Sequence, residues 1–100
     1  MTGSTLVARE EGVYAFHGGL TFATAGLLLE DMERMLEQAK MKSLVFDLAE
    51  VKTSDSAGLA LLLEGVQIAA RYGRVINYRN LPEDLLNLAR ISNAEELLPC

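Results

Sequence analysis

The stretch Thr53-Ser54-Asp55-Ser56-Ala57-Gly58-Leu59 is the central feature of this chain of 100 residues. It follows an apolar segment typical of a strand and precedes an apolar segment typical of a helix. It therefore predicts an exposed strand-to-helix turn, with Ser54, Asp55 and Ser56 as possible N-caps. The free N–H groups and the partial positive charge of the helix would lie beside Ser56, where a phosphate would be stabilised. In the simpler interpretation, which the residues alone leave open, these side chains only cap the helix.

A strand is predicted before this turn and a long helix after it. The segment Leu44-Val45-Phe46-Asp47-Leu48 is almost continuously apolar, which is typical of a central parallel strand covered on both faces. After the turn, apolar residues continue to about Tyr72, and Gly73 is suited to the position just beyond a helix end. We therefore expect a helix at about 57–72.

The predicted helix at 57–72 has two apolar sides. At about 100° per residue, one side, expected to face the core, contains Leu59, Leu62, Leu63, Val66, Ala69 and Ala70. The opposite side contains Ala57, Leu61, Gly65, Ile68 and Tyr72. An apolar far side indicates either a partner surface or burial beneath neighbouring helices. In so small a domain we favour a partner surface, and we predict that it consists of Thr53, Ser54, Asp55, Ser56, Gly58, Leu61, Glu64, Gly65, Ile68 and Tyr72.

The remaining segments complete a small α/β domain. Residues 5–9 and 13–17 are short β-branched and aromatic runs, and the residues between them are typical of a hairpin turn. A helix over one face of the sheet is predicted at about 22–39, where one apolar stripe recurs at three- and four-residue steps: Phe22, Ala25, Leu29, Met32, Leu36 and Ala39. Residues 75–78 form a strand pattern, and Pro82 fits the first turn of a third helix. This order predicts a single domain over residues 1–100, with a mixed sheet of about four strands and packed helices.

Composition limits the classes of function. The net charge of −5 argues against a nucleic-acid partner, because phosphate binding requires clustered Lys and Arg. The apolar runs are shorter than the roughly 20 residues of a membrane span, and the N-terminus lacks the pattern of a signal peptide. The single cysteine, Cys100, fits a reducing compartment. These observations predict a cytoplasmic protein.

The sequence does not indicate a catalytic centre. No Cys/His cluster has metal-ligand spacing, and no Gly-rich loop is followed by the lysine of a nucleotide site. The single histidine, His17, has no credible nucleophile partner. Asp47 and Asp55 could suggest an acid pocket, but the acidic pair expected at the end of the first strand is missing. We therefore expect no catalytic residue, no cofactor and no metal site.

Three segments together resemble a STAS domain, the fold shared by bacterial anti-sigma factor antagonists and the cytoplasmic tails of sulfate transporters. They are Leu44–Leu48, Asp55–Leu59 and Asn80-Leu81-Pro82-Glu83. The run 58–63 and the tail 88–99 are most similar to the MlaB group, which comprises small cytoplasmic subunits of phospholipid-transporting ABC systems. The resemblance covers about residues 44–99 by motif, and the first 40 residues by pattern only.

The resemblance implies two candidate functions. In the first, the chain is a non-catalytic subunit that docks on the ATPase of an ABC phospholipid transporter, which serves outer-membrane lipid asymmetry. It would then reach the inner membrane only through its partner. In the second, it is an anti-sigma factor antagonist that binds an anti-sigma factor kinase until it is phosphorylated on the serine that follows the aspartate, here Ser56. We favour the first because of the apolar far side of the helix and the similarity to the MlaB group.

Overall fold

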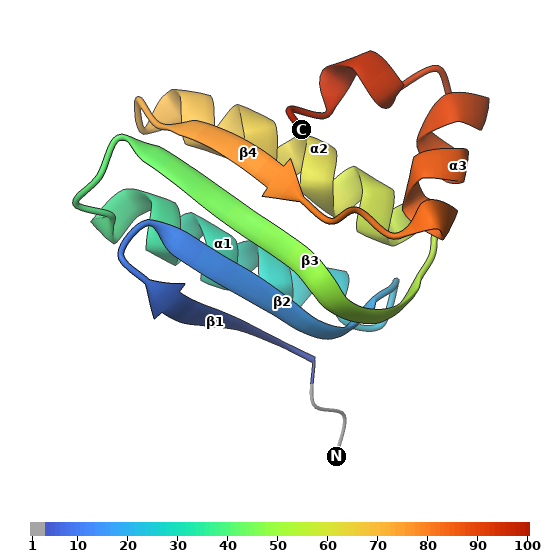
Figure 1. Cartoon of the computed structure of the whole chain (residues 1–100), viewed down its shortest axis with the longest axis horizontal. Coiled ribbons are helices and arrows are strands. Elements are labelled where there is room, and N and C mark those ends of the chain that lie inside the picture. Colours follow the sequence, from blue (N-terminus) through green and yellow to red (C-terminus); the bar gives the residue numbers. More distant parts are fainter. Residues whose placement is uncertain (1–3) are drawn as a thin grey trace.

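A four-stranded sheet in the order β1-β2-β3-β4 carries the fold in the computed structural model, which describes residues 4–100 (Figure 1). β1 is antiparallel to β2, whereas β3 is parallel to both β2 and β4. The elements are β1 (Thr5–Glu10), β2 (Val13–Leu20), α1 (Ala25–Gln38), β3 (Ser43–Ser54), α2 (Ser56–Arg71), β4 (Val75–Arg79), α3 (Glu83–Ile91) and a short 3-10 helix (Glu95–Leu97). The predicted mixed sheet with a central third strand is confirmed.

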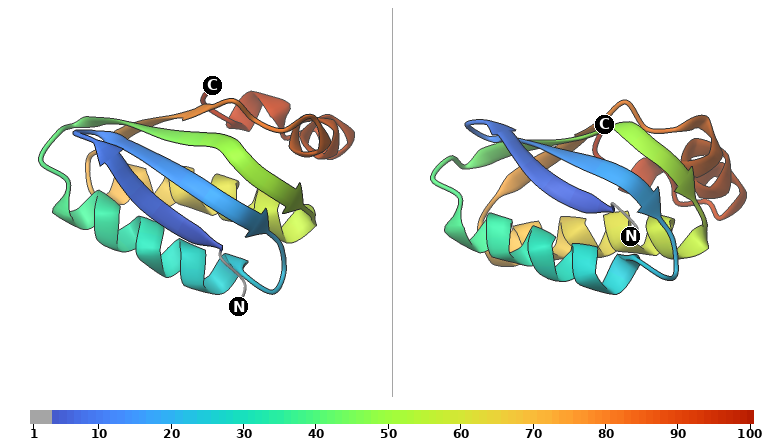
Figure 2. Two further views of the ribbon diagram at one scale, coloured as in Figure 1. Left: turned by 60° about the horizontal axis from the view of Figure 1, so that its bottom comes forward. Right: turned by 90° about the horizontal axis from the view of Figure 1, so that it is seen from below.

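The helices α1 and α2 lie side by side on the same face of the sheet (Figure 2). The strand order explains this, because the two parallel crossovers step in the same direction, from β2 to β3 to β4, and crossovers of one hand then fall on one face. The prediction that β3 is covered on both faces is therefore wrong. Leu44, Phe46 and Leu48 are buried, whereas Val45 and Asp47, which alternate with them, are only half-buried.

A row of aromatic rings forms the centre of the core. The ring of Phe46 lies 5.1 Å from Tyr14, 6.0 Å from Phe16 and 6.3 Å from Tyr78 between centroids. The hydroxyl of Tyr78 donates a hydrogen bond of 2.6 Å to the carbonyl of Leu62, which joins β4 to α2. Burial raises the pKa of Tyr78. The sheet thus holds α2 by a polar contact as well as by apolar packing.

The C-terminal segment covers the outer edge of β4. The backbone N–H of Tyr78 donates to the carbonyl of Pro99 at 2.7 Å, and the side chain of Leu98 is buried. The helix α3 contributes Leu85 and Ala89 to the same core. The 3-10 helix Glu95–Leu97 lies between α3 and this edge segment. These contacts anchor the last twenty residues beside α2 and β4.

Candidate functional site

Ser56 is the exposed first residue of α2. The residue before it, Asp55, has an extended backbone and is the N-cap. Its Oδ1 atom accepts hydrogen bonds from the N–H groups of Ala57, at 2.9 Å, and Gly58, at 3.3 Å. Of the three possible caps, Asp55 therefore holds the helix end, and Ser56 remains at the surface at the positive end of the helix dipole.

Asp55 also joins two loops. Its Oδ2 atom accepts the N–H of Phe22 at 3.1 Å, and its own N–H donates to the carbonyl of Leu20 at 3.2 Å. The loop from β2 to α1 is thus tied to the loop from β3 to α2, at the carboxyl ends of parallel strands, where open α/β sheets place functional loops. The bond from Phe22, together with those from Gly58 and Ala57, lowers the pKa of Asp55.

The stability contributed by Asp55 is expected to depend on pH. Because its folded-state pKa lies below the usual value of 3.8, the contribution is present above that value and is lost as the pH falls through the folded-state pKa. Urea unfolding of the wild type and of Asp55→Asn should differ most near neutral pH, and the difference should shrink towards about pH 2. An equal difference at both pH values would show that the carboxylate charge is not what holds the turn.

The other predicted residues of the turn lie close to Ser56. Thr53 is exposed and Ser54 is half-buried, both at the end of β3. Gly58 is buried because α2 begins directly against β2: a Cβ atom at Gly58 would lie 2.3 Å from the carbonyl oxygen of Leu20. The turn therefore brings Thr53, Ser54 and Asp55 close to Ser56 at the surface, whereas Gly58 lies beneath it and the prediction that Gly58 contacts a partner is wrong.

The predicted partner surface on the far side of α2 is wrong for Leu61, Gly65 and Ile68. Leu61 and Ile68 are each 3% exposed and belong to the core. A Cβ atom at Gly65 would lie 2.4 Å from Cε of Met32 in α1 and 2.6 Å from the hydroxyl oxygen of Tyr78. This side of α2 therefore faces the core, and at Gly65 it lies against both Met32 of α1 and Tyr78 of β4.

The exposed side of α2 is a different one. It carries Ser56, Ala60, Glu64, Gln67, Ala70 and Arg71. The expectation that Ala70 faces the core is therefore wrong. Tyr72 is half-buried, and its hydroxyl donates to Oε2 of Glu33 at 3.0 Å, which connects the end of α2 to α1. Of the residues predicted on the helix beyond Gly58, Glu64 is therefore the one that lies open on the surface.

A groove between α1 and α2 was not predicted from the sequence. It has a volume of about 270 Å³ and is lined by Ala25, Gly26, Leu29, Ala57, Ala60, Leu61 and Glu64. Phe22, which precedes α1 and is bonded to Asp55, is 88% exposed. The sequence assigned Phe22, Ala25 and Leu29 to a core-facing stripe. The only signal for the groove was the group of small residues on both helices.

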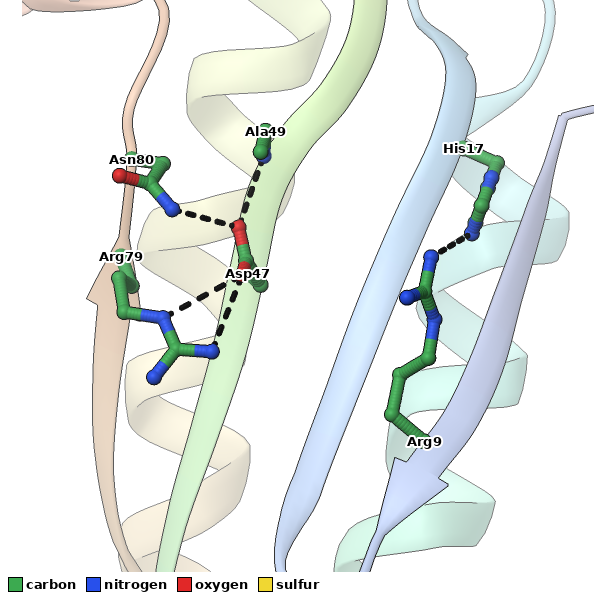
Figure 3. A network of polar contacts seen from close by, with 6 residues as sticks. All are labelled: Arg9, His17, Asp47, Ala49, Arg79 and Asn80. Carbon is green, nitrogen blue, oxygen red and sulfur yellow. Dashed lines mark hydrogen bonds and ion pairs between the residues drawn. The ribbon is translucent and has the colours of Figure 1, made fainter.

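The face of the sheet that α1 and α2 leave free carries a polar network (Figure 3). Asp47 accepts hydrogen bonds from the N–H of Ala49 at 2.9 Å, from Asn80 at 3.0 Å and from Arg79 at 3.0 Å. Partial burial opposes ionisation, but these partners prevail and lower the pKa of Asp47. Asp47 and Asp55 share no hydrogen-bond partner, so they do not form a common acid pocket.

No group of three or more His, Cys, Asp or Glu residues within residues 4–100 could hold a metal ion. None of the helices described above is long and apolar enough to cross a membrane.

Residues 7–99 match the family model described as "Mlab, STAS domain". The unphosphorylated anti-sigma factor antagonist SpoIIAA has a similar structure, with a TM-score of 0.71 and 11% identity over 96% of this chain and 85% of that one. The phosphorylated Bacillus cell-fate determinant SpoIIAA has a TM-score of 0.68 and 11% sequence identity over 96% of this chain and 88% of that one. A sulfate transporter family protein from Wolinella succinogenes has a TM-score of 0.68 and 18% sequence identity over 94% of this chain and 75% of that one. No curated protein sequence matches significantly. At these identities, the structural matches show the fold.

Proposed function

Because the chain belongs to the STAS domain family described as Mlab, we propose that it is a non-catalytic accessory subunit that docks on the ATPase of an ABC-type phospholipid transporter. STAS domains act through protein–protein contacts, which fits a small domain whose candidate site is a surface. One observation carries the proposal: the exposed Ser56 turn adjoins an apolar groove that opens on the same side of α2.

The docking surface in this proposal is centred on Ser56 and includes the exposed residues Thr53, Ala60 and Glu64. Two features make it rigid before binding. Asp55 connects the two loops at the start of α1 and α2, and Gly58 brings α2 against β2. A preorganised surface loses little conformational entropy on association. The subunit would thereby support assembly or activity of a transporter that maintains outer-membrane lipid asymmetry, and would lie at the inner membrane through its partner.

Variants of Ser56 test this function. Ser56→Ala should weaken docking about 3- to 10-fold, as expected for one lost hydrogen bond, and should leave the fold intact because Asp55 is the cap. Ser56→Asp should also fold, since an acidic residue is favourable at a helix N-terminus. Titration against the purified ATPase measures the affinity. The matched control is Ser43→Ala, an exposed serine at the opposite end of β3. Unchanged affinity in both Ser56 variants would contradict a contact at this residue.

The alternative function, an anti-sigma factor antagonist switched by phosphorylation of Ser56, predicts a different pattern. It is favoured by the exposure of Ser56 beside the first free N–H groups of α2. In this case Ser56→Ala would keep full affinity for a kinase-type partner, whereas Ser56→Asp would abolish it. Stoichiometric phosphate on Ser56 in the native protein would support this alternative and would contradict the role of a constitutive accessory subunit.

A further inference from the structure

Gly26 is a glycine that the fold of residues 4–100 does not explain. It lies in the first turn of α1, where alanine would favour the helix more than glycine does. Gly58 and Gly65 are required by close contacts, and Gly12, Gly18 and Gly73 have positive φ angles. A Cβ atom at Gly26, by contrast, would meet no atom within 4 Å, and its φ angle is not positive. The open space beside it is the groove between α1 and α2.

The groove is shaped to receive an apolar side chain. Its rim consists of small residues on both helices, and the side chains of Leu29 and Leu61 lie among its lining. It is open to solvent and has a volume of about 270 Å³. Because Ala25, Ala57 and Ala60 project little from their helices, the backbone of a third helix could approach closely along the groove.

The charge of the groove indicates what kind of helix fits it. Glu64 is the one charged residue in its lining, is exposed, and forms no ion pair within residues 4–100. The whole chain has a net charge of −5. A Lys or Arg of the partner, placed at the rim, would therefore be attracted to Glu64 and to the domain as a whole.

We propose that the groove receives one helix of the ATPase subunit, which inserts a large apolar side chain between Gly26 and Ala60 and places a Lys or Arg against Glu64. This inference rests on the proposed function and specifies the element of the partner that binds.

Two matched substitutions in α2 test the groove. Ala60→Leu fills it, whereas Ala70→Leu adds the same side chain at another exposed alanine of α2 that does not line it. Titration of the full chain with the purified ATPase subunit should show a loss of at least about 30-fold for Ala60→Leu, the size of a hot-spot effect, and at most about 3-fold for Ala70→Leu. Gly26→Leu should behave like Ala60→Leu and remain folded, since a Cβ atom there meets nothing.

The role of Glu64 is tested by charge reversal. Glu64→Lys should reduce the affinity at low salt, and the reduction should shrink as the salt concentration rises, because screening weakens the repulsion. Equal affinity for the wild type, Ala60→Leu and Gly26→Leu would overturn the inference while leaving the proposed function standing. Failure of the wild type to bind the ATPase would overturn both. A dimer of this chain that Ala60→Leu abolishes in sedimentation would assign the groove to a second copy instead, and would also overturn the inference.

Discussion

Replacing Ile68 with glutamate is expected to unfold the domain. Ile68 is 3% exposed and belongs to the core that α2 shares with the sheet and α1. An unpaired carboxylate at this position would cost several kcal/mol, a large part of the roughly 5–15 kcal/mol that stabilises a typical domain. Circular dichroism and urea unfolding of the isolated chain measure the effect.

The control for this experiment is Gln67→Glu, which introduces the same side chain at the adjacent exposed position of α2. It should leave the unfolding transition within about 0.5 kcal/mol of the wild type, as is usual for surface substitutions. A folded Ile68→Glu variant with wild-type stability would contradict the packing of α1 on α2, and would return this side of the helix to the list of candidate partner surfaces.

Gly58→Ala is expected to give the second largest effect. The added Cβ would lie 2.3 Å from the carbonyl oxygen of Leu20 and 3.0 Å from its Cβ atom, so α2 would have to move away from β2. Overpacking of this kind costs about 1–3 kcal/mol, which lowers the Tm by about 4–8 °C per kcal/mol in a domain of this size. The displacement of α2 would also shift Ser56, so affinity for the partner should fall with stability.

The chain provides a matched control for Gly58→Ala at Gly26. Gly26→Ala places a methyl group where no atom lies within 4 Å, and it should leave stability unchanged or raise it by about 0.5–1 kcal/mol, because alanine favours the helix. Scanning calorimetry of the two variants provides the comparison. A Gly58→Ala variant that is as stable as the wild type, or more stable in the way expected of Gly26→Ala, would indicate that helix propensity decides the outcome, and would contradict the close approach of α2 to β2.

The elements and their order could be predicted from the sequence because each depends on local patterns. The hairpin, the third strand and the turn before Ser56 are marked by alternation, apolar runs and cap residues over a few positions. The third strand is nevertheless longer than the predicted 44–48, since β3 extends to Ser54. Its second half contains polar residues and is recruited by pairing with β2, where Gly19 lies opposite Thr53 and Leu20 opposite Ser54.

Which side of α2 packs against the rest of the domain could not be predicted from the sequence. Periodicity shows which sides of a helix are apolar, but not what lies against them. Leu61 and Ile68 are buried because the fold turns this side of α2 towards the core shared with the sheet and α1, an arrangement that depends on the order of all four strands. The groove could not be predicted either, because its two walls, with Gly26 in α1 and Ala60 in α2, come from helices that are distant in the sequence. By contrast, the exposure of Ser56 follows from its place directly after the cap, and it was predicted on that basis.

The central claim, docking on a transporter ATPase, is tested most directly by purifying the intact chain at native abundance and identifying its stoichiometric partner by mass spectrometry. The same spectra measure the phosphate on Ser56. We predict an ABC-type ATPase in constant ratio to the chain, with Ser56 unmodified. A kinase-type anti-sigma factor as the stoichiometric partner, together with a phosphorylated pool of Ser56, would contradict the claim.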